Sequence, residues 1–469
     1  MNSVCLPTPV PGSFRDPSGR VYRFDNQIFR TVSHDFATDF EFVEATGFFE
    51  RLIEKGWTLP YMKVPTDRLH VVEQDIKYVL EVPLLPIVSF PYEWPFSALK
   101  AAALLHLNLH LLALEHGITL SDASAYNVQF QGGKPIFIDH LSFRRYREGE
   151  IWVGHRQFCE QFLNPLLLRA LFGVPHNAWY RGTQEGISAR DLSRFLKWRH
   201  FFNPNVVSHV VLQSYFQRMA QKNSDFLGEE KLNATVFSLG SFRLMLEKLD
   251  NWINQLEPAD TEKTVWQDYA KSHSYSSEEA QLKKIFVKEF VGHVKPKMLW
   301  DMGCNIGEYS KAALEAGAEY AVGFDFDQGA LEATFARARD ENLSLQSLFM
   351  DAANPSPNQG WNEEERQGLG ARSSVDAVLA LAFVHHLSIA RNIPLDQLLD
   401  WLLNLAPTGV IEFVPKEDPM VQELLRHRED IFPNYTEEFF LQHIATKATL
   451  VKTKVVSKSG RLLVWYARS

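Results

Sequence analysis

Short apolar runs and longer amphipathic stretches alternate along the second part of the chain. The runs have the length of buried strands, and the stretches between them have the spacing of helices. The runs lie at 297–300, 320–324, 345–350, 375–381 and 409–414, and the helical stretches at 309–316, 328–338 and 395–405. Strands that alternate with helices predict a parallel sheet covered by helices on both faces. Two final runs, 449–456 and 461–467, predict an antiparallel hairpin that ends this sheet.

The first part of the chain has another pattern. Residues 20–32 predict a β-hairpin, and helical stretches follow at 37–55 and 97–117. From about residue 151 the pattern is mostly helical, with breaks at three prolines. This part is therefore expected to be an α+β domain with a helical extension.

The seam between the two parts is expected within 255–264, which contain a proline and several charges but little apolar content. The predicted domains are 1–260, which is α+β, and 261–469, which is a Rossmann-like α/β domain. The longest apolar stretch, 101–118, is interrupted by histidine and glutamate residues. It predicts a core helix and not a membrane span.

Composition and charge narrow the possible partners. The 469 residues include 48 Lys and Arg against 57 Asp and Glu, a net charge of −9. DNA is not an expected partner, because tight polyanion binding relies on basic residues, while a local patch for RNA stays open. The first twenty residues lack the apolar run of a signal peptide, so we expect a cytoplasmic protein. The three cysteines lack CxxC spacing, so no metal site is expected, and no pattern indicates the oligomeric state.

One motif in the second domain carries specific chemistry. Asp301-Met-Gly303-Cys-Asn305-Ile-Gly307 follows a predicted strand and precedes a predicted helix. The glycines allow close approach of a ligand, and the helix start offers free N–H groups. The motif departs from the dinucleotide fingerprint G-x-G-x-x-G, and Asp301 would repel a pyrophosphate. A carboxylate there suits an ammonium or hydroxyl group, as in S-adenosylmethionine.

Two more acids end the next two predicted strands. Asp325 suits a bidentate hydrogen bond to ribose hydroxyls, and Asp351, followed by Ala352, lies where an adenine amino group would bind. Ligands of open α/β sheets bind outside the carboxyl ends of the strands, which favours a functional interpretation. The alternative is that these acids cap helices, and this alternative is strongest for Asp327.

From these motifs, residues 265–469 resemble the class I S-adenosylmethionine-dependent methyltransferases. The resemblance implies a seven-stranded sheet and a methionine-binding side formed by the 301–307 turn. Tyr269 and Tyr275 resemble aromatic residues of a preceding segment that closes over the cofactor; they are alternatively core residues.

The methyl acceptor is expected at the tips of the fourth and fifth strands, because acceptors approach there in this fold. The fourth strand is expected to end in 381–387, which contain His385 and His386, and the fifth strand ends in a segment that contains Glu412. These residues are candidates for proton removal or acceptor orientation, and a histidine suits a general base near neutral pH. The alternative is that the histidines are structural. A His-His-Glu metal site is not expected, because adjacent strand residues point to opposite faces unless a turn intervenes.

The connection 352–374 is unusually long, and loops of this length are often lids. Trp361 either closes over the acceptor or cofactor, or anchors the loop.

The first domain contains a polar loop between a predicted helix and a hairpin. Asp122 and Asn127 have D-x-x-x-x-N spacing, and Asp139 stands where a metal-binding aspartate would follow. Residues 20–150 therefore resemble the protein-kinase-like folds. The resemblance is incomplete, because the amino-terminal hairpin has one glycine and no strand lysine, with Arg30 the nearest replacement.

Three readings of this loop stay open: active phosphotransfer, ligand binding without phosphotransfer, and a structural scaffold. We expect no phosphotransfer, because a glycine-rich cradle and a lysine are missing. Asp122, Tyr126, Asn127 and Asp139 are instead candidates to bind the methyl acceptor.

Several segments along nearly the whole chain, among them 153–166 and 380–395, resemble a bacterial group of two-domain, nodulation-protein-like methyltransferases. This resemblance implies a methyltransferase tied to glycoconjugates or specialised metabolites, and it gives no acceptor. The leading hypothesis is an S-adenosylmethionine-dependent O-methyltransferase that acts on a small molecule, a glycan or a glycoconjugate. The alternatives are a bifunctional kinase-methyltransferase, an RNA or protein methyltransferase, and a non-catalytic cofactor-binding assembly protein.

Overall fold

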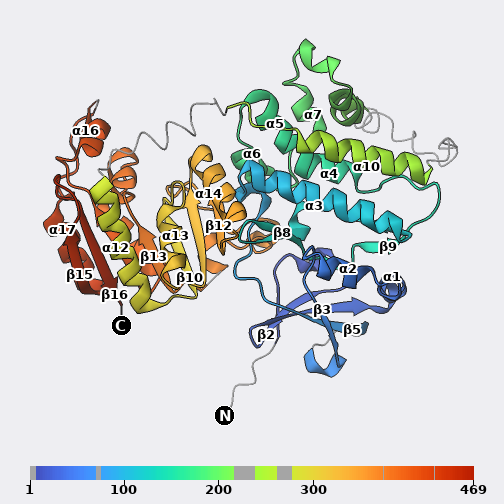
Figure 1. The fold of residues 1–469 in the computed structure, drawn as a ribbon, viewed down its shortest axis with the longest axis horizontal. Coiled ribbons are helices and arrows are strands. Elements are labelled where there is room, and N and C mark those ends of the chain that lie inside the picture. The colour runs from blue at the N-terminus through green and yellow to red at the C-terminus, as the bar shows by residue number, and fades with distance from the viewer. Residues whose placement is uncertain are drawn as a thin grey trace.

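The computed structural model describes six segments of the chain. They comprise residues 7–69, 75–215, 238–260, 277–372, 374–426 and 428–468. The carboxyl-terminal part is an α/β domain, and the amino-terminal part is an α+β domain with a helical extension (Figure 1). Tyr269 and Tyr275 lie outside the described residues.

The carboxyl-terminal domain is built on a seven-stranded sheet with the order β12-β11-β10-β13-β14-β16-β15. The first five strands of this order are parallel, and β16 is antiparallel to both of its neighbours, β14 and β15. The strands are β10 (Met298–Met302), β11 (Tyr320–Asp325), β12 (Leu345–Phe349), β13 (Ala377–Ala380), β14 (Thr408–Phe413), β15 (Thr449–Val455) and β16 (Leu462–Ala467). The predicted alternation of strands and helices, with a final antiparallel hairpin, is confirmed.

Helices cover both faces of this sheet, and the alternation of side chains along each strand explains why. In β10, Leu299 packs in one core with α12 and α13, while Trp300 belongs to the core of the opposite face. The helices are α12 (Ser277–Val294), α13 (Glu308–Glu315), α14 (Gln328–Asp340), α15 (Leu395–Leu405), α16 (Pro419–Leu425) and α17 (Glu437–Lys447). A sheet buried on both faces requires the continuous apolar runs found in the sequence.

The amino-terminal domain begins with a five-stranded antiparallel sheet of order β1-β2-β3-β5-β4. Its predicted hairpin turns at Asp25 and Asn26, both with positive φ, which suits a tight two-residue hairpin turn. The elements are β1 (Thr8–Pro9), β2 (Val21–Phe24), β3 (Gln27–Ser33), α1 (His34–Ala45), α2 (Phe48–Glu54), β4 (Met62–Val64) and β5 (Ile76–Val82).

A long helix and two small hairpins follow. The helix α3 (Phe96–Glu115) is, within the described residues, long and apolar enough to cross a membrane, but it is mostly buried inside the protein, as expected for a core helix. The cellular location stays a prediction. After α3 come β6 (Ile118–Leu120), β7 (Val128–Gln131), β8 (Lys134–Phe137) and β9 (Phe143–Arg145), with β7 paired to β8 and β6 to β9.

Among the described residues from 155 to 254, most are helical, as predicted. A continuous helical run contains α4 (His155–Phe158), the π-helical segment η5 (Cys159–Leu163) and α5 (Asn164–Phe172). The remaining helical elements are α6 (Asn177–Thr183), α7 (Ala189–Ser193), η6 (Trp198–Phe202), α8 (Pro204–Val206), η7 (Val207–Val211) and α10 (Leu239–Asn254).

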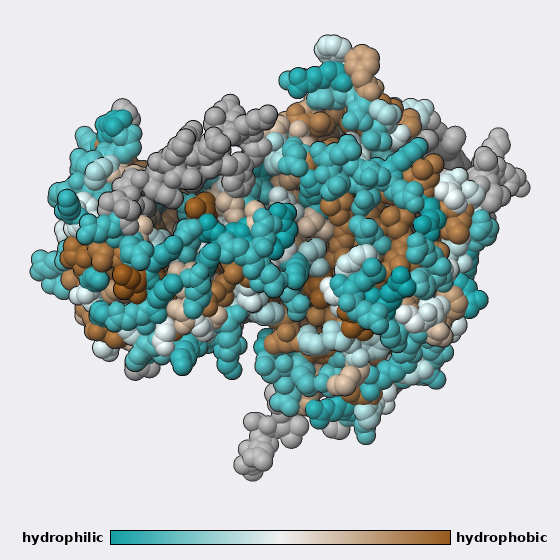
Figure 2. Space-filling view, in the orientation of Figure 1, coloured by the Kyte–Doolittle hydropathy of each residue, from teal (hydrophilic) through white to brown (hydrophobic). Residues whose placement is uncertain are grey.

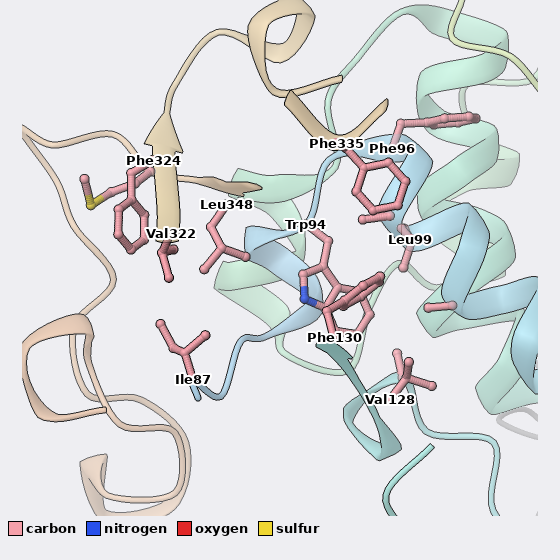
Figure 3. Packing of buried hydrophobic residues seen from close by; sticks show 14 of the residues in the cluster. Ile87, Trp94, Phe96, Leu99, Val128, Phe130, Val322, Phe324, Phe335 and Leu348 are labelled. Atoms are coloured by element: carbon pink, nitrogen blue, oxygen red, sulfur yellow. The ribbon is translucent and has the colours of Figure 1, made fainter. Parts of the chain in front are cut away.

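The two parts share one hydrophobic core. In Figure 3, Trp94 and Phe130 from the first part point toward Phe335 and Leu348 from the second. Arg169 of α5 adds a buried ion pair with Glu332 of α14, at 2.9 Å. The outer surface in Figure 2 is mostly hydrophilic on both parts. The domain boundary at 260/261 adjoins residues outside the described segments and stays a prediction.

Candidate functional site

The turn between β10 and α13 is shaped by three residues with positive φ. These are Gly303 (77°), Asn305 (49°) and Gly307 (74°), and asparagine tolerates this region better than most side chains. A Cβ atom at Gly303 would come within 3.0 Å of the Phe383 ring, and one at Gly307 within 3.0 Å of Thr334. The two glycines are therefore needed for backbone conformation and for space, and the turn packs against the residues that follow β13.

Asp301 lies buried beneath this turn. Its Oδ2 accepts a hydrogen bond from Ser310 Oγ at 2.6 Å. Burial raises the pKa of Asp301 to about 7, and the charge of Asp325 adds to the increase. A cationic group bound nearby would stabilise the ionised carboxylate, so this acid suits a ligand with an ammonium group.

Asp325 stands at the tip of β11 and ties two backbone segments together. Its Oδ2 accepts a hydrogen bond from the Asn305 N–H at 2.8 Å, and its Oδ1 accepts one from the Asp327 N–H at 2.9 Å. Burial raises the pKa of Asp325. Asp327 caps α14 by accepting a hydrogen bond from Ala330 N at 2.8 Å, so the capping interpretation is right for this acid.

Asp351 follows the end of β12, so acids mark three adjacent strand tips. Its Oδ1 accepts a hydrogen bond from Ala353 N at 3.0 Å, and Arg391 lies 3.3 Å from Oδ2. Ala352 is half-buried beside it. Because β12, β11 and β10 are neighbours in the sheet, the structure brings Asp301, Asp325 and Asp351 to one edge.

Phe326 is an exposed residue at this edge that sequence reasoning missed. It lies between Asp325 and Asp327, and 64% of its surface is exposed. An exposed aromatic ring beside a strand-tip acid offers an apolar surface for a flat ring. The signal was present in Gly323-Phe-Asp325-Phe, where an aromatic residue continues past the end of the strand.

His385 and His386 do not lie on a strand, which corrects the prediction. β13 ends at Ala380, Ala382 has a φ of 49°, and a π-helical turn, η11 (His386–Ala390), follows. The two imidazole rings are therefore neighbours, with centroids 4.2 Å apart, instead of pointing to opposite faces of a sheet. His385 is buried and His386 is exposed. Desolvation lowers the pKa of both, more strongly for His385.

Glu412 belongs to a buried network of charges. Its Oε2 accepts a hydrogen bond from the Ala382 N–H at 2.8 Å, and Lys283 Nζ lies 2.7 Å from its Oε1. Arg461 lies next to the pair and forms two hydrogen bonds to Asp418, at 2.7 and 2.8 Å. Burial opposes ionisation of Asp418, but the hydrogen bonds from Arg461, Ser459 and the Met420 N–H, with the charge of Arg461, together outweigh it and lower its pKa to about 2. Both oxygens of Glu412 are engaged, so it supports the turn before the histidines.

The connection 352–374 is fastened to the first domain, which differs from the lid predicted for it. Its contacts are Arg372 with Glu93, Glu365 with Arg15, Gln359 with Gln184, and the Asn354 carbonyl with Arg181. Trp361 is 71% exposed, so its side chain is not a buried anchor of the loop.

A hollow of about 360 Å³ lies between this connection and α15. It is lined by 355–358, 368–371, Trp401 and Leu405. Trp401 stacks on Phe383, with ring centroids 6.4 Å apart, and Phe383 contacts the cofactor turn at Gly303. The hollow is therefore joined to the strand tips through two aromatic side chains.

The polar loop of the first domain converges as its spacing predicts. Asn127 Nδ2 donates hydrogen bonds to Asp122 Oδ2 at 2.8 Å and to Asp139 Oδ2 at 3.3 Å. Burial and the charge of Asp139 raise the pKa of Asp122. Arg30 Nη2 lies 2.6 Å from Asp139 Oδ1, and Ser142 donates a hydrogen bond to Oδ2. The carboxylate of Asp139 is thus already paired with a strand cation.

Tyr126 faces away from these acids. Its hydroxyl donates a hydrogen bond to the Gln184 carbonyl at 2.8 Å, and the Arg366 guanidinium lies 4.1 Å from its ring centroid. Tyr126 therefore links the polar loop to the connection 352–374. The predicted residues form two groups, one at the strand tips and one around Asn127, and this aromatic contact lies between them.

The chain was compared with known proteins. No family model matches it. It is 45% identical over 465 residues to nodulation protein NoeA of Rhizobium meliloti (strain 1021), which covers 99% of this chain and 97% of that protein.

Similar solved structures include several methyltransferases. The 16S rRNA methylase RmtB is 15% identical over 40% of this chain and 63% of its own, with a TM-score of 0.29. The magnesium protoporphyrin IX methyltransferase ChlM of Synechocystis PCC 6803, with bound SAH, is 15% identical. The match covers 44% of this chain and 100% of that chain, with a TM-score of 0.30. The N-methyltransferase NodS of Bradyrhizobium japonicum WM9, in complex with SAH, is 10% identical. The match covers 40% of this chain and 87% of that chain, also with a TM-score of 0.30. These values are too low to transfer a substrate to this chain.

Proposed function

This chain belongs to the family of nodulation protein NoeA, and because its second domain is that of an S-adenosylmethionine-dependent methyltransferase, we propose that it O-methylates a small molecule or a glycan. The observation that carries the proposal is the set of acids at three adjacent strand tips around a turn with two positive-φ glycines. A phosphate-bearing cofactor fits poorly there, since the buried Asp301 would face it. S-Adenosylmethionine has an ammonium group and a ribose, and no phosphate.

The residues present fit this cofactor. A Cβ at Gly303 would come within 3.0 Å of Phe383 and one at Gly307 within 3.0 Å of Thr334, so glycine at both positions lets the turn fold closely beside the strand tips. Asp325 would hold the ribose hydroxyls, Asp301 and the turn would lie on the methionine side, and Asp351 with Ala352 would lie near the adenine. When bound, the cofactor supplies a methyl group on a sulfonium, which a nucleophile can accept.

The acceptor hydroxyl has to lose a proton, and the residues after β13 are placed to take it. His386 is exposed, and desolvation and the charge of Arg461 keep its imidazole neutral at physiological pH. His385 packs against it as a second candidate base. Glu412 acts as a positioning residue, because its bond to Ala382 and its ion pair with Lys283 hold the turn that presents the histidines.

The amino-terminal domain is proposed to bind part of the acceptor without transferring phosphate. The order of helix α3, β6, the loop with Asp122 and Asn127, the β7–β8 hairpin and Asp139 supports the proposed kinase-like arrangement. Asp122, Asn127, Asp139, Tyr126 and Trp361 are the candidate acceptor contacts. The pairing of Asp139 with Arg30 supports a domain without phosphotransfer.

The decisive experiment supplies the purified full chain with methyl-labelled S-adenosylmethionine and a bacterial metabolite extract, and identifies labelled products by mass spectrometry. We expect label on a hydroxyl of a small molecule or glycan, and no label with the Asp325→Ala variant. Label on RNA or on protein would replace the proposed acceptor class. Cofactor binding without transfer to any fraction would favour a binding protein.

A further inference from the structure

Three side chains that commonly bind metals meet inside the helical extension, and none of them belongs to either group of candidate residues. His155 begins α4, Cys159 lies one turn later in η5, and His209 lies in η7. His155 Nε2 is 3.0 Å from His209 Nδ1 and 3.6 Å from Cys159 Sγ. The ligand atoms of all three lie within 4.8 Å of one another.

These separations suit a single metal ion. Zinc–nitrogen bonds of about 2.0–2.1 Å and zinc–sulfur bonds of about 2.3 Å place neighbouring ligand atoms roughly 3.3–3.6 Å apart in a tetrahedron. Small side-chain rotations would bring the observed atoms to such distances. We propose that His155, Cys159 and His209 bind one thiophilic d¹⁰ cation, either Zn²⁺ or Cu⁺.

The ligand types and their surroundings support a soft cation. One sulfur and two imidazole nitrogens are ligands that both cations accept, whereas Mg²⁺ and Ca²⁺ prefer oxygen. Aromatic side chains enclose the cluster: Trp152 packs edge-on against the His155 ring, and Trp252 stacks on the His209 ring. Cys159 is fully buried.

The two cations differ in the net charge of the complex that they would form. Binding forms one metal–sulfur and two metal–nitrogen bonds and releases the thiol proton to solvent, so the protein contributes one negative charge. A Cu⁺ complex is then neutral, while Zn²⁺ leaves one positive charge that a bound hydroxide in the fourth position would neutralise.

The ion would stabilise the polar loop of the first domain. Gln157 Oε1 accepts a hydrogen bond from Ala123 N at 3.0 Å, and Gln161 Oε1 accepts one from Ala125 N at 2.8 Å. Both glutamines lie on the helical run that carries His155 and Cys159. A metal bond to His209 would therefore fix the helix that holds this loop in place.

The test uses the full chain, without a histidine tag, after chelator treatment. Titration with Co²⁺ should give one equivalent bound, with a thiolate-to-cobalt charge-transfer band. If the site binds zinc, Zn²⁺ should displace the cobalt. If it binds copper, the protein should compete with bicinchoninate for Cu⁺. Cys159→Ser should abolish the band and lower metal affinity at least about 100-fold, since a thiolate ligand is lost. Cys304→Ser removes another buried thiol and should keep the band.

Two results would overturn the site. The first is a wild-type chain that binds none of the three ions stoichiometrically, and the second is binding that Cys159→Ser leaves unchanged. If circular dichroism finds Cys159→Ser unfolded, His155→Gln provides the same comparison, with a loss of affinity expected.

Discussion

Arg372 and Glu93 form a buried bidentate ion pair between the connection 352–374 and the first domain. Arg372 Nη1 donates to Glu93 Oε2 at 2.7 Å, and Nη2 donates to Oε1 at 2.5 Å. Arg372 Nη1 also donates to the Val88 carbonyl at 3.0 Å. The two parts of the chain are therefore joined by a desolvated charge pair as well as by their apolar core.

Removing one member of this pair should destabilise the protein strongly. Arg372→Met leaves the Glu93 carboxylate buried without its cation, and such changes cost about 3–5 kcal/mol. The double variant Arg372→Met/Glu93→Gln should recover part of this loss, because no isolated charge remains. Thermal unfolding of the three proteins measures both effects. Equal melting temperatures for the wild type and Arg372→Met would show that the pair does not join the domains.

Asp325→Ala should weaken S-adenosylmethionine binding. A charge-assisted hydrogen bond contributes about 1.5–3 kcal/mol, which corresponds to roughly 10–150-fold in affinity. Asp327→Ala is the matched control, since it removes a neighbouring acid that caps α14 and should mainly lower stability, by about 1 kcal/mol. Calorimetry on both variants separates the two roles. Unchanged affinity in Asp325→Ala would contradict the assignment of the ribose site.

The strand-tip acids could be predicted because their signal is local. Asp301, Asp325 and Asp351 each end a continuous apolar run, and parallel strands place such ends on one edge of the sheet. The glycine turn could be predicted equally well, because Gly303 and Gly307 lie in the short segment between a predicted strand and a predicted helix. Neither step requires contacts between distant parts of the chain.

The surroundings of the candidate base could not be predicted, because they depend on distant residues. The apolar run 375–381 ends close to Ala380, but no local pattern indicates the positive φ at Ala382 or the π-helical turn that follows, so the histidines were expected on the strand. Lys283 and Arg461, which surround Glu412, come from other elements with no pattern in common. The contacts of the connection 352–374 could not be predicted for a similar reason, since its partners lie in the first domain.

The pH dependence of methyl transfer should have an acidic limb below pH 6.5, the ordinary pKa of histidine. Because desolvation lowers the pKa of both histidines, the neutral base persists to lower pH, and the rate falls only as pH drops through the lowered value. His386→Asn should reduce kcat by about 10²–10⁴-fold with unchanged cofactor affinity. Steady-state profiles of the two proteins test this. If His386→Asn kept the acidic limb and the full rate, another group would be the base.

Asp301 should make the cofactor-free protein less stable as pH rises. Its folded pKa of about 7 lies above the ordinary value of 3.8, so its protonated form is favoured by folding. The stabilisation is complete below pH 4 and is lost as pH rises toward 7. Asp301→Asn should therefore gain in melting temperature relative to the wild type between pH 5 and pH 8, while binding the cofactor more weakly. A constant difference between the two proteins across this range would contradict the raised pKa.

The polar loop around Asn127 should have no activity toward ATP. Phosphoryl transfer depends on metal ions held by carboxylates, and Arg30 lies 2.6 Å from the carboxylate of Asp139 that would be needed. We expect no magnesium-dependent ATP hydrolysis by the wild type, and no gain in the Arg30→Lys variant. Asp122→Ala should instead impair methyl transfer with unchanged cofactor affinity, because Asp122 belongs to the proposed acceptor group. An ATPase activity that disappears in Asp139→Ala would reverse this assignment and support a bifunctional enzyme.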